Sequence, residues 1–388
     1  MIAPFGLRPK GTLAQRMLPL AQALTAQGHH VRIVAPAYLN PADAGRCEQH
    51  GGVEVVHVQL PRTPGPLAFG ETAFHLVSAT HAGRPDVVHV FKPKGYSGLA
   101  ALLWRRWQPR IPVVQDTDDW EGWGGWNDLQ PYPWAMKHFF AWQERTLPRR
   151  AAAVTVASHT LQTQVWGFGV APERVLYLPN GVSLPPTLPE RSAARHQLGL
   201  DDAPVVLLYT RFWEYPPHMV QALLSGIATH PAARLLVIGA GERGEEAQLL
   251  AWASTAGHAA RLDVRGWAAP ATIQAAFAAA DVAVMPFADT LMNRAKCSVK
   301  LLELLNAAVP VVASRVGQAA AYIDHPHTGV LVPPGDGAAL AQAALALLAD
   351  PDRRALLGAA GQQHVQQHFP WHAQAANLAA LYQAVICG

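Results

Sequence analysis

Four carboxylates lie within six residues of the chain, at Asp116, Asp118, Asp119 and Glu121. They follow an apolar run at 111–114 that we predict to be a buried strand, so they lie at its C-terminal end. Carboxylates in that position could bind sugar hydroxyls, hold a metal ion, or act as acid and base. A metal site is the least expected of the three, because no nearby histidine supplies a clear further ligand. This acidic run is therefore a candidate catalytic centre.

A second candidate site combines basic side chains with the start of a predicted helix at 299–306. Lys296 and Lys300 lie around that start, and Arg211 lies just after another predicted strand, 205–209. Cationic side chains and the N–H groups of a helix N-terminus both attract phosphate. Glu303 lies further along the same helix, where its carboxylate could accept hydrogen bonds from ribose hydroxyls. The arrangement suits a nucleoside diphosphate.

A glycine-containing turn at 4–12 joins the first predicted strand to the first predicted helix. Gly11 would let a ligand approach the backbone closely, next to a helix N-terminus. The turn lacks the G-x-G-x-x-G spacing of dinucleotide-binding proteins. An ordinary strand-to-helix loop explains its spacing equally well.

Aromatic residues are concentrated directly after the acidic run. They are Trp120, Trp123, Trp126, Tyr132, Trp134, Phe139, Phe140 and Trp142. Aromatic rings stack on the faces of sugars and also settle at membrane interfaces. Phe139 and Phe140 fit equally well in a protein core. The segment could bind a bulky or lipid-linked acceptor, close over the site, or touch a membrane.

Short β-branched runs alternate with helical patterns along nearly the whole chain, which is typical of α/β folds with parallel sheets. In the first half, strands are predicted at 1–5, 31–34, 53–58, 87–91, 111–114 and 153–157. In the second half, they are predicted at 205–209, 235–238, 282–285 and 311–313, with helices at 221–227, 245–256, 271–279 and 299–306. Such sheets bind ligands beyond the C-terminal ends of their strands, which is where both candidate sites lie.

A proline-rich segment at 179–189 separates the two series of strands and predicts two domains. We expect an N-terminal domain over residues 1–182 and a C-terminal domain over residues 183–371. The first predicted helix begins near Leu13 and contains Pro19, which should bend it.

Composition argues against several classes of protein. The 388 residues are 50% hydrophobic and 15% charged, with a formal net charge of +3, so a large core is available and a nucleic-acid-binding face is not expected. Cys47, Cys297 and Cys387 lie far apart, which argues against a disulfide scaffold and a Cys-rich zinc site. No apolar run reaches the roughly 18 residues of a membrane span. We expect a cytoplasmic protein, with contact to the inner face of the membrane left open.

Taken in order, six segments of the chain resemble the family 4 glycosyltransferases of the GT-B fold. They are 178–182 (LPNGV), 237–242 (VIGAGE), 280–286 (ADVAVMP), 300–305 (KLLELL), 309–314 (VPVVAS) and 329–336 (GVLVPPGD). Each is a weak signal alone, but their order along almost the full chain is specific. The resemblance implies an α/β protein with two doubly wound, Rossmann-like domains facing across a cleft. It also implies a C-terminal helix, 372–388, that packs back on the N-terminal domain.

The same resemblance implies the retaining transfer of a sugar from a UDP- or GDP-linked donor, without a cofactor and without a metal ion. The C-terminal half would bind the nucleotide-sugar. The N-terminal half would bind the acceptor, which could be a glycan, a lipid-linked molecule or a small molecule. No nucleic-acid partner is implied.

Several donor-binding residues follow from the resemblance by position. Glu303 matches the family glutamate that holds the ribose, and the backbone around Ser298 matches the turn that cradles the diphosphate. Arg211 matches the arginine that neutralises the diphosphate. Gly11 matches a first-domain glycine near the same phosphate. Trp267 lies where family members contact the base through the backbone.

Two positions of the donor site depart from the family pattern. Ala295 replaces the first glutamate of the motif, and Asn293 or Lys296 could take over its contact with the donor sugar. No lysine closely follows Arg211, and Lys300 or Lys296 could supply that charge.

A third departure concerns the catalytic centre. The acidic run replaces a histidine that the family often carries after a strand of the first domain. Asp118 aligns best with that histidine, and Asp116 and Asp119 are the alternatives. Asp118 would orient the acceptor or the sugar hydroxyls during transfer on one face of the sugar, without a covalent intermediate.

Other functions are compatible with parts of the same architecture. An epimerase would change the sugar of a nucleotide-sugar without an acceptor. A binding protein that has lost catalysis would keep its nucleotide affinity. The missing glutamate at Ala295 and the missing lysine after Arg211 support this alternative. The chain is too short for a pyridoxal-phosphate-dependent phosphorylase. A nicotinamide dehydrogenase is disfavoured, because the first turn lacks the required glycine spacing.

Overall fold

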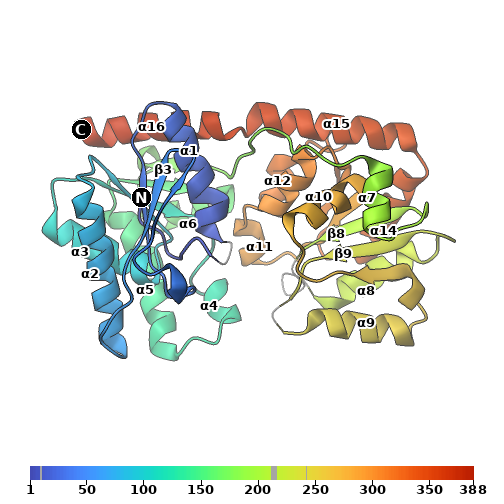
Figure 1. Ribbon diagram of the computed structural model, residues 1–388, viewed down its shortest axis with the longest axis horizontal. Coiled ribbons are helices and arrows are strands. Elements are labelled where there is room, and N and C mark those ends of the chain that lie inside the picture. The colour runs from blue at the N-terminus through green and yellow to red at the C-terminus, as the bar shows by residue number, and fades with distance from the viewer. Residues whose placement is uncertain (9–10, 211–215, 242) are drawn as a thin grey trace. The chain divides into compact units, whose positions relative to one another are not determined.

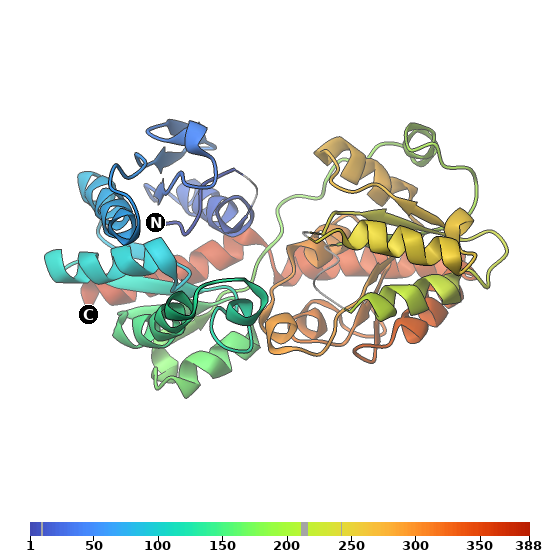
Figure 2. The ribbon, with the colours of Figure 1, turned by 90° about the horizontal axis from the view of Figure 1, so that it is seen from below.

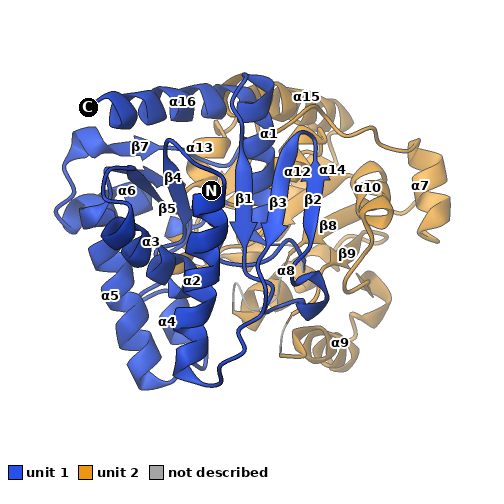
Figure 3. Ribbon diagram, turned by 60° about the vertical axis from the view of Figure 1, so that its left-hand side comes forward, with its two compact units in different colours: residues 1–181, 295–297, 370–388 blue, residues 182–294, 298–369 orange. Residues whose placement is uncertain are grey.

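The computed structural model describes residues 1–8, 11–210, 216–241 and 243–388. The chain divides into two compact units, coloured separately in Figure 3. Unit 1 comprises residues 1–181, 295–297 and 370–388, and unit 2 comprises residues 182–294 and 298–369. The short segment 295–297 therefore belongs to the compact body of unit 1, although the residues on both sides of it belong to unit 2.

The strands of unit 1 are β1 (Arg32–Ala35), β2 (Cys47–His50), β3 (Val53–His57), β4 (Val88–Phe91), β5 (Val113–Thr117), β6 (Ala153–Val156) and β7 (Val175–Tyr177). They pair in the orders β1-β3-β2 and β4-β5-β6-β7, in parallel except for the β2–β3 pair. Ile2 joins the two groups, because it bridges both Val34 and Val90. The strand predicted at 1–5 is thus wrong in extent, since Pro4 has no N–H with which to continue a ladder.

Helices flank these strands, as Figure 1 shows. Unit 1 has a π-helical turn (Leu13–Met17) followed by α1 (Leu18–Ala26), then α2 (Pro66–Ala82), α3 (Gly95–Trp107), α4 (Trp126–Leu129), α5 (Trp134–Arg150), α6 (His159–Gly167) and α16 (Trp371–Cys387). Short 3₁₀ turns lie at Pro41–Asp43 and Pro172–Arg174. Because Pro19 cannot donate to the carbonyl of residue 15, the regular α-helical ladder is interrupted where the π turn meets α1.

The C-terminal helix α16 is an integral part of unit 1. Trp371, Ala375 and Leu378 are buried in one cluster with Leu13 and Met17 of the π turn. The burial of this apolar stripe holds α16 in place along α1.

Unit 2 is built on a single parallel sheet in the order β10-β9-β8-β11-β12-β13. Its strands are β8 (Val205–Tyr209), β9 (Arg234–Ile238), β10 (Leu262–Val264), β11 (Val282–Met285), β12 (Val311–Ser314) and β13 (Val330–Val332). Its helices are α7 (Arg191–Gln197), α8 (Pro217–Ile227), α9 (Glu245–Thr255), α10 (Pro270–Ala279), α11 (Leu291–Ala295, whose last residue belongs to unit 1), α12 (Val299–Asn306), α13 (Ala319–Tyr322), α14 (Gly337–Leu348) and α15 (Pro351–His368), with a 3₁₀ turn at Ala259–Arg261. Helices lie on both sides of the sheet (Figure 2). The fold class predicted from the sequence is confirmed, because both units are α/β and unit 2 is doubly wound.

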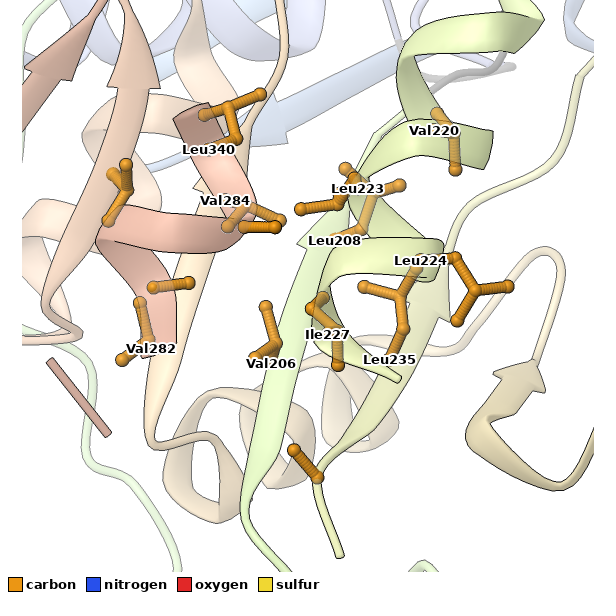
Figure 4. Close-up of a cluster of buried hydrophobic side chains, with 14 of the residues drawn as sticks. Val206, Leu208, Val220, Leu223, Leu224, Ile227, Leu235, Val282, Val284 and Leu340 are labelled. Atoms are coloured by element: carbon orange, nitrogen blue, oxygen red, sulfur yellow. The ribbon is translucent and has the colours of Figure 1, made fainter. Parts of the chain in front are cut away.

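The core of unit 2 explains why its central strands are uninterrupted apolar runs. Side chains from β8, β9 and β11 interlock with α8, α9 and α14, as Figure 4 shows for Val206, Leu208, Leu223 and Leu340. A parallel strand covered on both faces must be apolar on both faces. Within the described residues, no helix is both long enough and apolar enough to cross a membrane.

Candidate active site

The first carboxylate of the acidic run lies inside the sheet. β5 extends to Thr117, so Asp116 is a strand residue and is completely buried. This corrects the prediction that the strand ends at 114 and that all four carboxylates follow it. Arg16 donates to Asp116 through Nε (3.0 Å) and Nη2 (2.6 Å), and Thr155 donates through Oγ1 (2.6 Å). These partners compensate the burial of the charge and allow the strand to continue.

The other three carboxylates surround one lysine. Lys92 follows β4 and is itself buried, with Nζ 3.0 Å from Asp118 and 2.8 Å from Glu121. It also donates to Asp119, while Lys94 donates to Glu121 at 2.7 Å. Lys92 has a φ of 59°, a left-handed backbone that is unusual for a side chain of this size. We call these five residues the acid–lysine cluster: Lys92, Lys94, Asp118, Asp119 and Glu121.

Burial and charge act in opposite directions within the acid–lysine cluster. Burial raises the pKa of Asp118 and of Asp119 above the usual range, although Lys92 counteracts it. Burial also acts on Glu121, but Lys92 and Lys94 outweigh it and lower its pKa to about 2. For Lys92, the three carboxylates outweigh burial and raise the pKa well above its usual value.

A buried carboxylate on α5 supports the loop of this cluster. Glu144 accepts the N–H of Glu121 at 2.7 Å, and a side chain at Gly122 would collide with the Glu144 carboxylate. Burial raises the pKa of Glu144 to about 7. The loop is therefore anchored by a group that titrates near neutral pH.

The glycine turn predicted to approach a ligand reaches the acid–lysine cluster. Thr12, which directly follows Gly11, donates its hydroxyl to Asp118 at 3.2 Å. The structure thus places the residue after Gly11 in contact with Asp118, just beyond the C-terminal end of β5. Pro9 and Lys10, in the same turn, lie outside the described residues.

In unit 2, three predicted donor-binding residues gather on α12. Ser298 caps this helix, and its Oγ accepts the N–H of Leu301 at 3.3 Å. Glu303 forms a hydrogen bond with Tyr209, the last residue of β8, and the Nζ of Lys300 lies 5.8 Å from the centre of the Tyr209 ring. Burial and the neighbouring Glu303 both raise the pKa of Tyr209, so its phenol stays protonated and donates.

The remaining predicted donor-binding residues lie on separate segments. Asn293 on α11 is buried, and its Nδ2 donates to the carbonyl of Ala288 at 3.0 Å. Trp267 follows β10 and is 72% exposed. Lys296 belongs to unit 1. Arg211 lies outside the described residues.

The aromatic segment has a buried part and an exposed part. Phe140 is buried, with the Tyr132 ring 5.2 Å away, as expected for a core residue. On α5, Trp134 is 73% exposed and Trp142 is 44% exposed. His138 lies between them in the helix, in ring contact with Trp134.

Sequence reasoning did not single out Lys92, Lys94, Arg16, Asn180 or Tyr209. For the two lysines a signal was available, because Lys-Pro-Lys-Gly directly follows the predicted strand at 87–91. Parallel neighbouring strands end at the same edge of a sheet, which places these lysines beside the acidic run. Arg16 and Tyr209 meet their partners only through the tertiary fold. In the described part of the chain, no group of three or more His, Cys, Asp or Glu side chains is arranged to hold a metal ion.

Comparison with known proteins identifies the family. A glycosyl transferase 4-like domain matches residues 11–181, and a glycosyl transferases group 1 domain matches residues 203–350. A D-inositol 3-phosphate glycosyltransferase from Thermobispora bispora is 35% identical over 357 residues, which cover 86% of this chain and 81% of the relative. The chain belongs to the group 1 glycosyltransferases. The resemblance to family 4 is thereby confirmed.

A second relative is a GDP-mannose-dependent monoacylated alpha-(1-6)-phosphatidylinositol monomannoside mannosyltransferase from Corynebacterium glutamicum. It is 30% identical over 241 residues, and the match spans 59% of this chain and only 61% of the relative. Among solved structures, sucrose-phosphate synthase from Thermosynechococcus elongatus superimposes with a TM-score of 0.79 at 22% identity, covering 100% of this glycosyltransferase and 98% of that chain. This similarity confirms the GT-B fold.

Proposed function

We propose that this glycosyltransferase moves a sugar from a UDP- or GDP-linked donor to an acceptor hydroxyl, with retention of the anomeric configuration. The observation that carries the proposal is the cluster on α12, where Ser298 caps the helix and Lys300 and Glu303 lie beside Tyr209 at the end of β8. Glu303, oriented by Tyr209, would accept the ribose hydroxyls. The first N–H groups of α12 and the ammonium of Lys300 would hold the diphosphate.

The chemistry requires stabilisation of a departing diphosphate. The bond from the anomeric carbon to the phosphate oxygen breaks while the acceptor oxygen bonds to the same face of that carbon. The acceptor proton passes to the departing phosphate oxygen. The N–H groups of α12, with Arg211, Lys300 and Lys296 as candidate cations, would stabilise the negative charge that develops on the diphosphate.

The acid–lysine cluster would bind hydroxyl groups of the reactants. Asp118 and Asp119 are the better candidates for this role, because both oxygens of Asp116 are already engaged by Arg16 and one of them also by Thr155. Lys92 keeps the two carboxylates in place and offsets their charge. We assign Asp118 to orienting a hydroxyl, since Thr12 also contacts it from the glycine turn.

We further propose that no metal ion and no cofactor take part. Each of the four carboxylates is within ion-pair distance of a cationic side chain: Asp116 of Arg16, and the other three of Lys92. To gain these ligands, a divalent cation would have to displace Lys92 or Arg16 and would place one more positive charge in a buried site.

The acceptor that we propose is an inositol-containing or lipid-linked molecule at a membrane surface. The names of the two relatives, one acting on D-inositol 3-phosphate and one on a phosphatidylinositol mannoside, support this class. The exposed residues Trp134, His138, Trp142, Arg145 and Arg149 follow one another on α5 at spacings of three and four, so they share one face. Aromatic and basic side chains on one helical face are typical of contact with anionic lipid headgroups.

A thermal-shift screen of the purified protein against UDP, GDP, ADP and their common sugar conjugates tests the donor site. A ligand that binds only the folded state raises the unfolding midpoint. We expect a rise with one nucleotide family, and GDP-mannose is the first candidate because the Corynebacterium relative is named as dependent on it. Glu303→Gln should lose the rise, and the exposed Glu173→Gln in unit 1 should keep it.

Two results would overturn the proposal. Absence of a shift with every nucleotide would remove the assigned donor site. A shift accompanied by a changed sugar on the nucleotide, with no acceptor present, would indicate an epimerase.

A further inference from the structure

A hydrogen-bonded chain of side chains crosses the interior of unit 1 and ends at the segment that precedes α12. Its centre is Arg16 in the π turn, whose side chain is almost completely buried. The guanidinium donates to both oxygens of Asp116, to the carbonyl of Leu178 at 2.8 Å, and to Oδ1 of Asn180 at 3.0 Å. A planar group with donors on several sides is thereby held in one orientation.

The contact with Arg16 determines which way the Asn180 amide faces. Arginine has only donors, so the side-chain oxygen of Asn180 must face it. The amide NH₂ of Asn180 then faces the other way and donates to the carbonyl of Cys297 at 2.8 Å. The backbone N–H of Asn180 also donates to Sγ of Cys297, at 3.1 Å. Asn180 therefore forms hydrogen bonds with both the backbone and the side chain of Cys297.

Cys297 lies directly before the helix that we assign to diphosphate binding. Cys297 is the last residue of the segment 295–297, which belongs to unit 1. The next residue, Ser298, caps α12 and belongs to unit 2. Fixing the Cys297 carbonyl fixes the peptide plane that carries the N–H of Ser298, because carbonyl and N–H share that plane.

We propose that Arg16 and Asn180 are positioning residues for the donor: they orient the peptide between Cys297 and Ser298 so that the N-terminus of α12 holds the diphosphate. This inference rests on the donor site proposed above and adds to it two residues that touch no part of the donor themselves. It gives the buried Arg16–Asp116 ion pair a role beyond stability, since buried ion pairs often stabilise a fold no more than apolar residues of similar volume.

The opposite end of the same hydrogen-bonded chain supplies a matched control. Thr155, which donates to Asp116, accepts from Nε2 of His89 at 3.1 Å, and Nδ1 of His89 accepts from the hydroxyl of Tyr382 at 2.7 Å. Tyr382 lies on α16. Tyr382→Phe removes one hydrogen bond from the same buried network, at the end opposite to Cys297.

The test compares how tightly nucleoside diphosphate and monophosphate bind to the full-length protein. In Asn180→Asp, a carboxylate oxygen replaces the NH₂ and repels the carbonyl of Cys297. The ligand is GDP or UDP, whichever the wild type binds. We expect the affinity for this diphosphate to fall about tenfold, and the affinity for the corresponding monophosphate to change less than about twofold. Arg16→Lys, which keeps the charge but loses the planar fork, should show the same split, and Tyr382→Phe should leave both affinities unchanged.

Each outcome supports or overturns the positioning role. Equal loss of both affinities, or no loss, in Asn180→Asp would overturn it, and Arg16→Lys decides the question if Asn180→Asp does not fold. A split of the same size in Tyr382→Phe would also overturn it, because the effect would then be one of general destabilisation. Failure of the wild type to bind any nucleotide would instead remove the proposed function.

Discussion

In unit 1 the charged side chains of the candidate site are buried and neutralise one another, whereas in unit 2 those on α12 are half-buried and gather around the start of one helix. The acid–lysine cluster depends on Lys92, which sits among three carboxylates. The α12 cluster depends on the Ser298 cap and on the contact between Glu303 and Tyr209. Substitutions that change charge should therefore have different effects in the two units. In unit 1 they should lower the stability of the fold, and in unit 2 they should mainly weaken nucleotide binding.

Removing the central cation of the acid–lysine cluster should give the largest effect. Lys92→Met leaves Asp118, Asp119 and Glu121 buried without their shared partner. Breaking a buried ion pair from one side costs about 3–5 kcal/mol, so the free energy of unfolding should fall by that amount. Urea denaturation measures it, with Lys137→Met on α5 as the control. A loss below about 1 kcal/mol, which is typical of a surface ion pair, would show that the buried charges of unit 1 do not determine its stability.

The pH dependence of stability separates two neighbouring glutamates. The pKa of Glu144 is raised to about 7 in the folded protein, so its contribution to stability falls as pH rises from its ordinary value of 4.5 towards 7. The pKa of Glu121 is lowered to about 2, so its contribution is lost as pH falls from 4.5 towards 2. Glu144→Gln should therefore remove a decline of up to about 3 kcal/mol between pH 5 and pH 8. Unchanged pH dependence in urea titrations of this variant would contradict the assignment.

The α12 cluster should respond in binding and not in stability. Glu303→Gln removes the charge that would accept the ribose hydroxyls. Hydrogen bonds to a charged group contribute about 1.5–3 kcal/mol, so nucleotide affinity should fall by about one to two orders of magnitude. Isothermal titration with the nucleotide found in the screen measures it. The proposed difference between the units would be wrong if Glu303→Gln lowered the free energy of unfolding by this amount and left the nucleotide affinity unchanged.

The exposed face of α5 should give the smallest effect. Trp134→Ser removes a largely exposed indole, so binding to vesicles containing anionic lipid should weaken severalfold without loss of folding. Trp107→Ser, on α3, is a matched control because Trp107 is also exposed, at 49%. Equal sedimentation of both variants with vesicles would remove the proposed membrane face.

The parts of the fold that the sequence predicts correctly are those determined by local pattern. The central strands of unit 2 are continuous apolar runs and lie where they were predicted, as does α12. The edge strand β2 was missed, because Cys47–His50 is polar and is ordered only by pairing with β3. The spacing of Ser298, Lys300 and Glu303 on one helix likewise made their grouping predictable.

Contacts between distant parts of the chain were not predictable. Asp116 looked like a loop residue because a carboxylate in the middle of a sheet is unfavourable unless it is paired. Its partner Arg16 lies 100 residues away, and nothing in the local pattern connects the two. Tyr209 meets Glu303 for the same reason, through the order of strands and helices in unit 2. Arg211, predicted to neutralise the diphosphate, lies outside the described residues and stays a prediction.

The most direct test of the central claim is to follow turnover of the selected nucleotide-sugar by proton NMR, with an inositol phosphate or its lipid as acceptor. We expect release of the nucleoside diphosphate and a new glycosidic bond with the same anomeric configuration as the donor, lost in Glu303→Gln. Inverted configuration would contradict retention. A nucleotide-sugar that binds but is never consumed, with any of these acceptors or with water, would contradict the assignment of this chain as an active transferase.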